Sequence, residues 1–210
     1  MVKCLFGTEF CVNFACMKVL LRDEIEQISE ETVQELLLQL PQWRREAMLR
    51  FKHLAGRREG AAAFLLLQQA LREECGLIEV PPFSYTEHGK PFLQDYPHIH
   101  FNLSHCRTAV LCALSDRPVG VDVERIRTAR PDLVRYTMNA DEQRQIFSSV
   151  QPDLEFTRLW TRKEAVVKLT GEGVGNAMHD LLLPAHLQQL GVQLTTTDGK
   201  GYVYTIATHL

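Results

Sequence analysis

Apolar and polar positions repeat with different periods in different stretches of this 210-residue chain, and the periods predict both strands and helices. Residues 1–20 alternate apolar and small polar positions, which is typical of strands. From Ser29 the spacing becomes helical, with Val33 and Leu40 on one apolar face, and Pro41 ends that helix. Strand and helix patterns therefore occur in separate regions.

The same reasoning extends along the chain. Helices are predicted at residues 42–54, 61–74, 131–136, from 139 onward, and 154–169. Strands are predicted at residues 83–85, 98–105, 108–114, 120–124, 181–183, 192–194 and 202–206. The strands at 108–114 and 120–124 are expected to pair as a hairpin across a short turn that contains Pro118. Because strands and helices are segregated by region, the predicted fold class is α+β.

The central stretch Gly120–Glu124 carries the first candidate chemistry. On a strand, Asp122 and Glu124 point to one face and the intervening valine to the other. The two carboxylates would then be roughly 6.6 Å apart along the backbone. A hard cation such as Mg2+ prefers carboxylate oxygens and could be bound between them. The alternative is an exposed strand whose acids are simply solvated.

A second candidate lies on the helix predicted at 154–169. Trp160, Glu164 and Lys168 follow one another at intervals of four residues and so share a face of this helix. Glu164 and Lys168 have the favourable order for an ordinary surface ion pair, which is the alternative interpretation. A large tryptophan on the same face favours a half-buried face and therefore a site.

The region 42–59 is the most basic part of the chain, with Arg44 and Arg58 among its cations. Arginine forks suit phosphate oxygens, but a solvated helix face explains a run of charges equally well.

Ser104 and His105 raise the question of a hydrolase. Because adjacent strand residues point to opposite faces, His105 could not easily activate Ser104, and a histidine that donates to an anion is the better interpretation.

Composition narrows the classes of protein. The net charge of −3 gives no signal for nucleic acid or membrane binding, and no apolar run approaches the ~20 residues of a membrane span. Glu9 and Asn13 interrupt any signal-peptide core, so a cytoplasmic location is expected. The six cysteines include no C-x-x-C pair; reduced, mostly buried thiols are expected, and no zinc site.

Four motifs together resemble a known family, the 4'-phosphopantetheinyl transferases of the Sfp type. They are G-K-P (Gly89–Pro91), F-N-L-S-H (Phe101–His105), P-V-G-V-D-V-E (Pro118–Glu124) and W-T-R-K-E-A-V-V-K (Trp160–Lys168). The two core signatures, G-[IV]-D-x-E and W-[ST]-x-K-E-[AS]-x-x-K, both occur without a substitution. The resemblance covers about residues 41–175; one departure is Ala47, where some relatives have a second lysine.

This resemblance implies a reaction and its cofactors. The family moves the phosphopantetheine arm from coenzyme A to a serine hydroxyl of an acyl or peptidyl carrier protein, with Mg2+, and releases adenosine 3',5'-bisphosphate. It also implies two similar α+β halves packed as a pseudo-dimer with the site between them. The expected division is residues 1–115 for coenzyme A contacts and residues 116–210 for the metal and catalytic motifs. A monomer is expected.

The resemblance assigns roles residue by residue. Asp122, Glu124 and Glu164 would hold Mg2+, and Glu164 and Lys168 would act on the reacting groups. Coenzyme A would be bound by Lys90, Pro91, Ser104, His105, Lys168 and Arg44, and by Arg58 or its neighbour Arg57. The serine proton would go to Glu164, to a metal-bound hydroxide or to Glu142.

Two other classes of function stay open at this point. A module that binds coenzyme A or a carrier protein without catalysis would share the binding residues, although the complete acidic set argues against it. A Mg2+-dependent phosphodiesterase would cleave coenzyme A without a carrier. The sequence does not say which carrier, or which of the fatty acid, polyketide and peptide pathways, is served.

Overall fold

The computed structural model describes residues 10–14, 17–172 and 176–210, and within them the fold is α+β, as predicted. The strands are β1 (Phe10–Phe14), β2 (Met17–Asp23), β3 (Ser84–Tyr85), β4 (Pro91–Phe92), β5 (His100–His105), β6 (Ala109–Ser115), β7 (Val119–Arg125), β8 (Val192–Asp198) and β9 (Tyr202–His209). The α-helices are α1 (Glu30–Gln39), α2 (Gln42–Leu49), α3 (Leu54–Cys75), α4 (Pro131–Thr137), α5 (Ala140–Ser148), α6 (Pro152–Thr170) and α7 (Pro184–Leu190). Two short 3-10 helices are η1 (Ile25–Gln27) and η2 (Asn176–His179).

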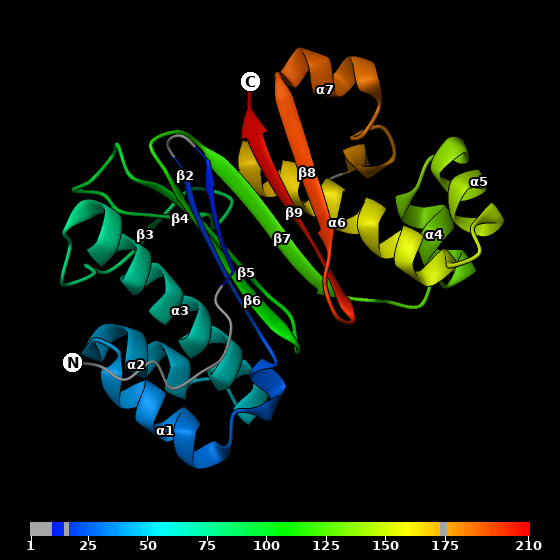
Figure 1. Cartoon of the computed structure of the whole chain (residues 1–210). Helices are drawn as coiled ribbons and strands as arrows, with labels where there is room; N and C mark the ends of the chain where they lie inside the picture. Colours follow the sequence, from blue (N-terminus) through cyan, green and yellow to red (C-terminus); the bar gives the residue numbers. More distant parts are fainter. Residues whose placement is uncertain (1–9, 15–16, 173–175) are drawn as a thin grey trace.

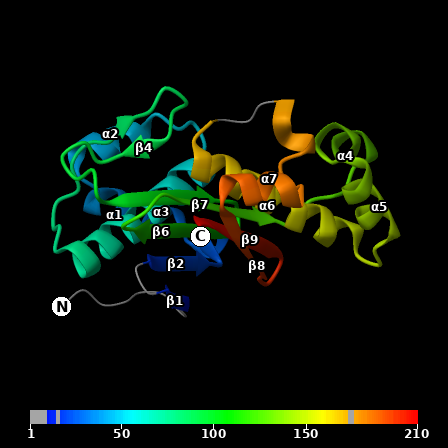
Figure 2. The same ribbon diagram turned by 90° about the horizontal axis from the view of Figure 1, so that it is seen from above.

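The described strands form antiparallel sheets. One has the order β1-β2-β6-β5, a second is the short β3-β4 hairpin, and the third has the order β7-β9-β8. Helices α1 to α3 lie on one side of the strands and α4 to α7 on the other (Figure 1). The view from above shows the strands as a layer that runs through the middle of the molecule (Figure 2).

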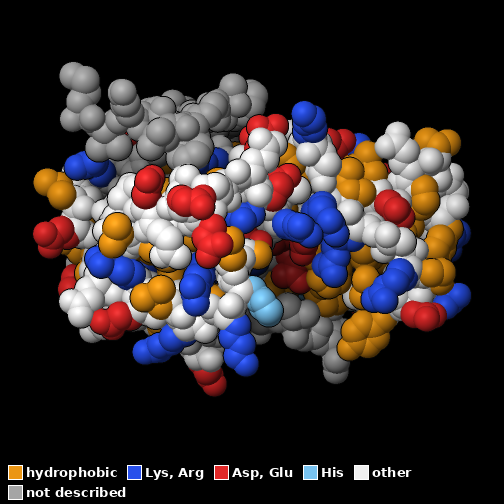
Figure 3. All heavy atoms as spheres, turned by 90° about the horizontal axis from the view of Figure 1, so that it is seen from below, with side chains coloured by type: hydrophobic (Ala, Val, Ile, Leu, Met, Phe, Trp, Pro, Cys, Tyr) orange, Lys and Arg blue, Asp and Glu red, His pale blue; other side chains and the backbone are white. Residues whose placement is uncertain are grey.

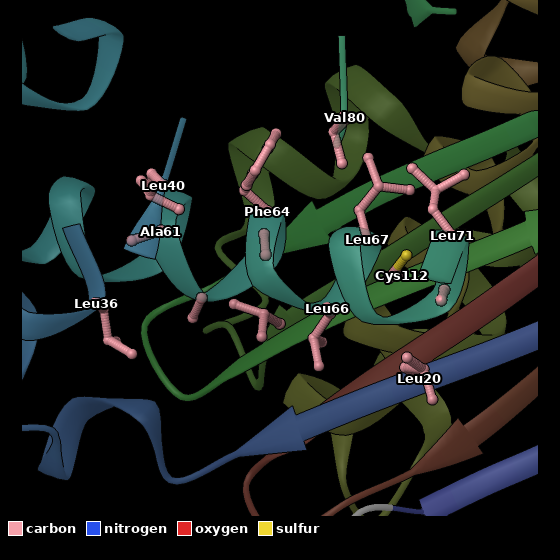
Figure 4. Packing of buried hydrophobic residues seen from close by; sticks show 14 of the residues in the cluster. Leu20, Leu36, Leu40, Ala61, Phe64, Leu66, Leu67, Leu71, Val80 and Cys112 are labelled. Carbon is pink, nitrogen blue, oxygen red and sulfur yellow. The ribbon is translucent and has the colours of Figure 1, made fainter. Parts of the chain in front are cut away.

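The largest core lies between α3 and the first sheet. Phe64, Leu67 and Leu71 on α3 are fully buried, and they lie in one cluster with Leu20 of β2 and Cys112 of β6 (Figure 4). The near-continuous apolar sequence of β6 follows from this position, because its described neighbours cover both faces and leave six of its seven residues buried. The expectation of reduced thiols is confirmed for Cys75, Cys106 and Cys112, of which only Cys75 is exposed.

Local signals account for several helix ends. Ser29 accepts a hydrogen bond from the Thr32 N–H and caps α1, as predicted. Helix α2 is shorter than predicted, however, and ends at Leu49 rather than Leu54. The guanidinium of Arg57 donates to the carbonyls of Leu49 and Phe51, so a side chain satisfies acceptors that a longer helix would have paired internally.

Two strand predictions were wrong. The strands β6 and β7 follow each other but do not pair, because β6 lies between β2 and β5 while β7 pairs with β9. The turn at residues 116–118 carries the chain from one sheet to the next instead of closing a hairpin. Residues 181–183 form a turn before α7 rather than a strand; Pro184 at the first helical position starts that helix.

The C-terminal region is organised by α6, which packs against β7 and β9. Asn139 and Glu142 form a capping box that starts α5, as the sequence indicated for Asn139. The predicted turn before Tyr202 joins β8 to β9. Gly171 ends α6 in the left-handed conformation, with φ 75°, and the other two glycines of that run lie outside the described residues.

The two larger sheets meet through a shared apolar cluster. Leu111 and Ala113 of β6 pack there with Val121 and Val123 of β7. At the edge of this cluster the hydroxyl of Tyr202 donates to Asp23 Oδ2 at 3.2 Å, which joins the third sheet to the end of β2. Among the described residues, no helix is long and apolar enough to cross a membrane.

Candidate active site between β5, β7 and α6

Strand β7 and helix α6 approach each other so closely that only glycine fits at position 120. A Cβ atom there would lie 2.1 Å from the Ala165 carbonyl oxygen and 2.4 Å from the Leu169 nitrogen, both backbone atoms of α6. Contacts this short do not occur between real atoms, so Gly120 allows the close approach. The glycine of the G-V-D-V-E motif thereby brings β7 against the helix that carries Glu164 and Lys168.

Asp122 is buried at the centre of this contact, with 4% of its surface exposed. Its Oδ1 accepts a hydrogen bond from Lys168 Nζ at 2.7 Å and another from Ser104 Oγ at 2.9 Å. Lys168 also donates to Ser104 Oγ at 3.0 Å. The structure therefore joins three residues that the sequence assigned to the site, from β5, β7 and α6.

Side chains of β5 also bind the backbone of β7. Asn102 Oδ1 accepts from the Val121 N–H at 2.8 Å, and Ser104 Oγ accepts from the Val123 N–H at 3.1 Å. These two N–H groups point away from β9, and side chains take the place that a neighbouring strand would fill. Asn102 and Ser104 thus form a seam between the two larger sheets, on either side of Asp122.

Glu124 lies two residues farther along β7 and is held at one oxygen. Its Oε1 accepts from Trp160 Nε1 at 3.3 Å and pairs with Arg127 at 3.3 Å. The Arg127 guanidinium in turn lies over the Trp160 ring, 5.1 Å from its centroid. The tryptophan of the W-T-R-K-E motif therefore has a polar role as well as an apolar one, since it orients an acid of the strand.

Asp122 affects the titration of both neighbouring glutamates. Burial raises the pKa of Glu164, and the charges of Asp122 and Glu124 raise it further, while the Lys168 and Arg127 charges lower it. Burial likewise raises the pKa of Glu124, with Asp122 as the second cause. Three carboxylates in partial burial repel one another, and the nearby cations offset that repulsion only in part.

The carboxylates could hold a cation, although they do not yet surround one point. Within the described residues, no three His, Cys, Asp or Glu side chains are close enough together to bind a metal ion as they stand. Yet Asp122 Oδ2 is buried and has no hydrogen-bond partner among these residues. A buried carboxylate oxygen without a donor fits an oxygen-ligated divalent cation, as does the all-carboxylate donor set.

His105 points away from Ser104, as its place on the strand predicted. Its side chain is 45% exposed, and its Nδ1 lies 3.0 Å from Glu59 Oε2 on α3. Ser104, the residue before His105, is buried against Asp122. The histidine therefore does not activate the serine, and its ring orientation is fixed from the helix instead.

The side-chain ammonium of Lys90 is bound by backbone carbonyl groups. Its Nζ donates to the carbonyl oxygens of Lys168 at 2.6 Å, Leu169 at 3.1 Å and Val119 at 3.4 Å. Burial lowers the pKa of Lys90. Pro91, the next residue, begins β4 and pairs in register with Tyr85 of β3.

The two arginines assigned to coenzyme A are partly buried. Arg44 lies over the rings of Phe64 and Phe83, at 5.4 and 5.8 Å from their centroids, and burial lowers the pKa of this arginine. Arg58 donates to the Glu26 carbonyl at 2.8 Å. The Nε atoms of both arginines are buried without a partner in the described part of the chain, so each has a donor left for an anion.

Glu142, a third candidate for the base, is bound elsewhere. It accepts from the Asn139 N–H and forms an ion pair of 2.8 Å with Lys163, which is fully buried. Lys163 also donates to the Met178 carbonyl. Both side chains of this pair therefore link α5, α6 and η2.

Charges of both signs gather on one face of the molecule. In the view from below, acidic side chains lie recessed among Lys and Arg side chains, with a histidine beside them (Figure 3).

Comparison with known proteins gives matches to one family. The family model of the 4'-phosphopantetheinyl transferase superfamily matches residues 118–206, which include β7 and α6. The 4'-phosphopantetheinyl transferase AcpT of Salmonella typhi is 33% identical over 168 residues, which are 77% of this chain and 78% of that protein. The chain belongs to the 4'-phosphopantetheinyl transferase family.

Other members of the family match different lengths of the chain. A 4'-phosphopantetheinyl transferase of Bacillus pumilus is 34% identical over 134 residues, 62% of this chain and 58% of that protein. The 4'-phosphopantetheinyl transferase Sfp of Bacillus subtilis is 24% identical over 182 residues, 85% of this chain and 81% of that protein. The match thus spans less than two thirds of the Bacillus pumilus protein.

Three residues of this candidate site were not assigned from the sequence. Asn102 lies within the quoted F-N-L-S-H motif, and its place two residues before Ser104 on one strand face was the available signal. Glu59 is one of few acids in a basic region, and that isolation was its signal. For Arg127 no pattern was available, because its contact with Trp160 depends on how β7 and α6 pack.

Proposed function

We propose that this chain transfers the 4'-phosphopantetheine arm of coenzyme A to a serine of an apo acyl or peptidyl carrier protein. The serine oxygen forms a bond to the phosphorus that bears the arm. The bond from that phosphorus to the bridging oxygen breaks, and adenosine 3',5'-bisphosphate leaves with the electron pair. The serine proton passes to a base of the enzyme.

The observation that carries this proposal is the environment of Asp122. Lys168 and Ser104 bind one oxygen of the buried carboxylate, and the other oxygen has no donor. Burial raises the pKa of both Glu124 and Glu164, and the charge of Asp122 raises both further. A site with surplus buried negative charge suits a divalent cation that in turn binds a pyrophosphate.

The residues present fit Mg2+. Asp122, Glu124 and Glu164 would hold it, and the bound ion would neutralise charge on the pyrophosphate. Arg127 and Trp160 orient Glu124, while Ser104 orients Asp122. The protein therefore keeps two of the three acids in place before any ligand binds, and this lowers the cost of arranging the site.

Coenzyme A would be bound by cations and donors from both sides of the seam. Lys168 would neutralise the leaving phosphate, and His105, oriented by Glu59, would donate to a phosphate oxygen. Ser104 would contribute its hydroxyl beside Lys168. Arg44 and Arg58 keep unpartnered buried donors for the 3'-phosphate.

The nucleotide would lie along the backbone of Lys90 and Pro91 at the start of β4. This leaves the Lys90 ammonium in its contacts with α6. Both residues therefore stay assigned to the nucleotide, but the proposed contacts are made by their backbone and by the proline ring, not by the Lys90 side chain.

Glu164 is the proposed acceptor of the serine proton. The pKa of Glu164 is raised and so lies closer to neutral pH than that of an ordinary glutamate, which is the direction that a general base needs. Glu142 is less suited, because its carboxylate already pairs with Lys163 and the Asn139 N–H. A metal-bound hydroxide stays the alternative base.

We also infer the larger arrangement of the molecule. Residues 1–115 and 116–210 would be two similar halves packed as a pseudo-dimer, since each contains an antiparallel sheet and a long helix, α3 or α6. Residues of the first half would bind coenzyme A, and those of the second would hold the metal. A monomeric, cytoplasmic enzyme with no nucleic acid or membrane partner follows from this proposal.

The decisive experiment mixes the protein with coenzyme A, Mg2+ and a panel of apo carrier proteins and weighs each carrier by mass spectrometry. We expect a gain of one phosphopantetheine on at least one carrier and no gain when EDTA replaces Mg2+. Coenzyme A binding without any gain across the panel would instead favour a silent binding module. Loss of coenzyme A without a carrier would favour a phosphodiesterase.

A further inference from the structure

Lys90 makes an unusual set of contacts for a residue assigned to a nucleotide. An ammonium group has three protons, and Lys90 Nζ has three carbonyl oxygens within hydrogen-bond distance. All three belong to elements distant in sequence, α6 and β7. Lys90 itself immediately precedes β4 and is half-buried.

Two of these acceptors are orphan carbonyls at the end of a helix. Lys168 and Leu169 lie in the last turn of α6, where carbonyl groups lack partners within the helix. A cation is favourable at that end because the helix dipole places partial negative charge there. The third acceptor, at 3.4 Å, is the carbonyl of Val119, the first residue of β7.

Lys90 thereby connects the two elements whose side chains meet at the site. Its shortest contact, 2.6 Å, is to the backbone carbonyl of Lys168, whose own ammonium donates to Asp122. The backbone of Lys168 is held on one side and its side chain on the other. A shift of the last turn would move the Lys168 ammonium relative to Asp122 and Ser104.

We propose that Lys90 is a positioning residue, which fixes the last turn of α6 and so sets where the Lys168 ammonium lies, and that it does not contact a phosphate of coenzyme A through its side chain. The inference rests on the proposed transfer. The side chain of the lysine in the G-K-P motif would thus hold the end of α6 in place and would not bind the nucleotide. We call this role the clamp.

The two roles predict different kinetics for Lys90→Met. Loss of a phosphate contact would raise the KM for coenzyme A and change kcat little. Loss of the clamp is expected to lower kcat by about 10- to 100-fold, since misplacing a catalytic group by about 1 Å costs that much, and to change KM less than about threefold. Lys90→Arg keeps the cation and is expected to restore part of kcat.

A double-mutant cycle tests whether Lys90 acts through Lys168. In a Lys168→Arg background, Lys90→Met is expected to have much less effect on kcat than in the wild type, because the group that it positions is already altered. Equal effects in both backgrounds, or a rise in KM alone, would overturn the proposal. Lys200→Met, on the exposed β8–β9 turn, is the matched control and should match the wild type.

Two further measurements separate this inference from the proposed function and from loss of the fold. Hydrogen exchange in the segment 165–171 should be faster in Lys90→Met than in the wild type, and calorimetry should give similar coenzyme A affinity for both. If the wild type were inactive but Lys90→Met still showed faster exchange and unchanged coenzyme A affinity, the proposed transfer would be rejected and the clamp role of Lys90 would be retained. If Lys90→Met does not fold, Lys90→Gln takes its place, since an amide still donates to one carbonyl.

Discussion

Asp122 shows how the roles of single residues depend on their hydrogen bonds. One of its oxygens receives Ser104 and Lys168, and the other is buried without a donor. Ser104 accepts the Val123 N–H while it donates to Asp122, so one hydroxyl fixes both the strand and the acid. The neighbouring Glu124 and Glu164 add negative charge that the described cations offset only in part.

Glu164→Gln is the sharpest test of that charge. The pKa of Glu164 is raised above its ordinary 4.5 in the folded state, so the fold retains a proton that the unfolded chain has lost. The contribution of Glu164 to stability therefore falls as pH rises through the window just above 4.5. In EDTA, Glu164→Gln should have a higher Tm than the wild type at neutral pH and a similar Tm below that window.

The same variant should lose the proposed phosphopantetheine transfer, because it lacks the residue proposed both to hold the metal and to act as the base. Thermal unfolding followed by circular dichroism across this pH range gives the first readout, and carrier mass gives the second. Glu87→Gln, at an exposed position, is the control and should change neither. A Tm at neutral pH equal to or below that of the wild type would contradict the assigned repulsion.

At the scale of elements, the site depends on how β7 lies against α6. Gly120 permits this approach, and the apolar Val121 and Val123 fix the strand in the cluster between the sheets. Trp160 and Lys168 then reach from the helix to the acids of the strand. Two side chains eight residues apart on α6 thus contact two acids that are two residues apart on β7.

Gly120→Ala should disrupt this contact. The atoms that its Cβ would meet are backbone atoms of α6, which cannot rotate away, so the helix must shift. We expect a loss of about 1–3 kcal/mol in the free energy of unfolding, as for overpacking in a core, and a large loss of transfer. Urea unfolding and the carrier assay measure the two effects.

Gly56→Ala is the matched control for that substitution. The three atoms nearest to the new Cβ all belong to the ring of Phe51, which is about half exposed and can move. Because alanine favours a helix over glycine, this variant should be as stable as the wild type or more stable. If Gly120→Ala behaved like Gly56→Ala, the close approach of β7 and α6 would constrain neither the stability of the protein nor the proposed transfer.

At the scale of the whole molecule, the site lies on the seam where the two larger sheets meet. Side chains rather than a continuous backbone ladder join β5 to β7, through Asn102 and Ser104. Tyr202 and Asp23 add a second link at another point of the same boundary. A change at the seam should therefore affect stability and activity together.

Asn102→Leu tests the seam without changing the acids. Leucine keeps most of the volume but leaves the buried Val121 N–H without an acceptor, which costs about 1–3 kcal/mol. We expect a lower unfolding midpoint in urea and a lower kcat, because β7 carries Asp122. Ser115→Ala removes an acceptor from an exposed backbone N–H and should cost much less; equal losses for both variants would refute the role of burial here.

Part of this arrangement could be predicted from local patterns. Ser29, Asn139 and Gly171 marked helix ends because caps depend on residues close in sequence. The acidic face of β7 and the shared face of α6 followed from the periods of strand and helix. The pairing of β6 with β7 was predicted wrongly. A short connection favours a hairpin, but here β6 and β7 belong to two different sheets that bury their apolar residues against each other.

The sequence alone determined which residue types are available: acids two apart on a strand, a tryptophan, a glutamate and a lysine four apart on a helix, and motifs that resemble one family. Only the tertiary structure decided what each one binds. It put Lys90 on the end of α6, Glu59 on His105 and Lys163 on Glu142. Periodicity places a side chain on a face, but its partner comes from whichever distant element packs against that face.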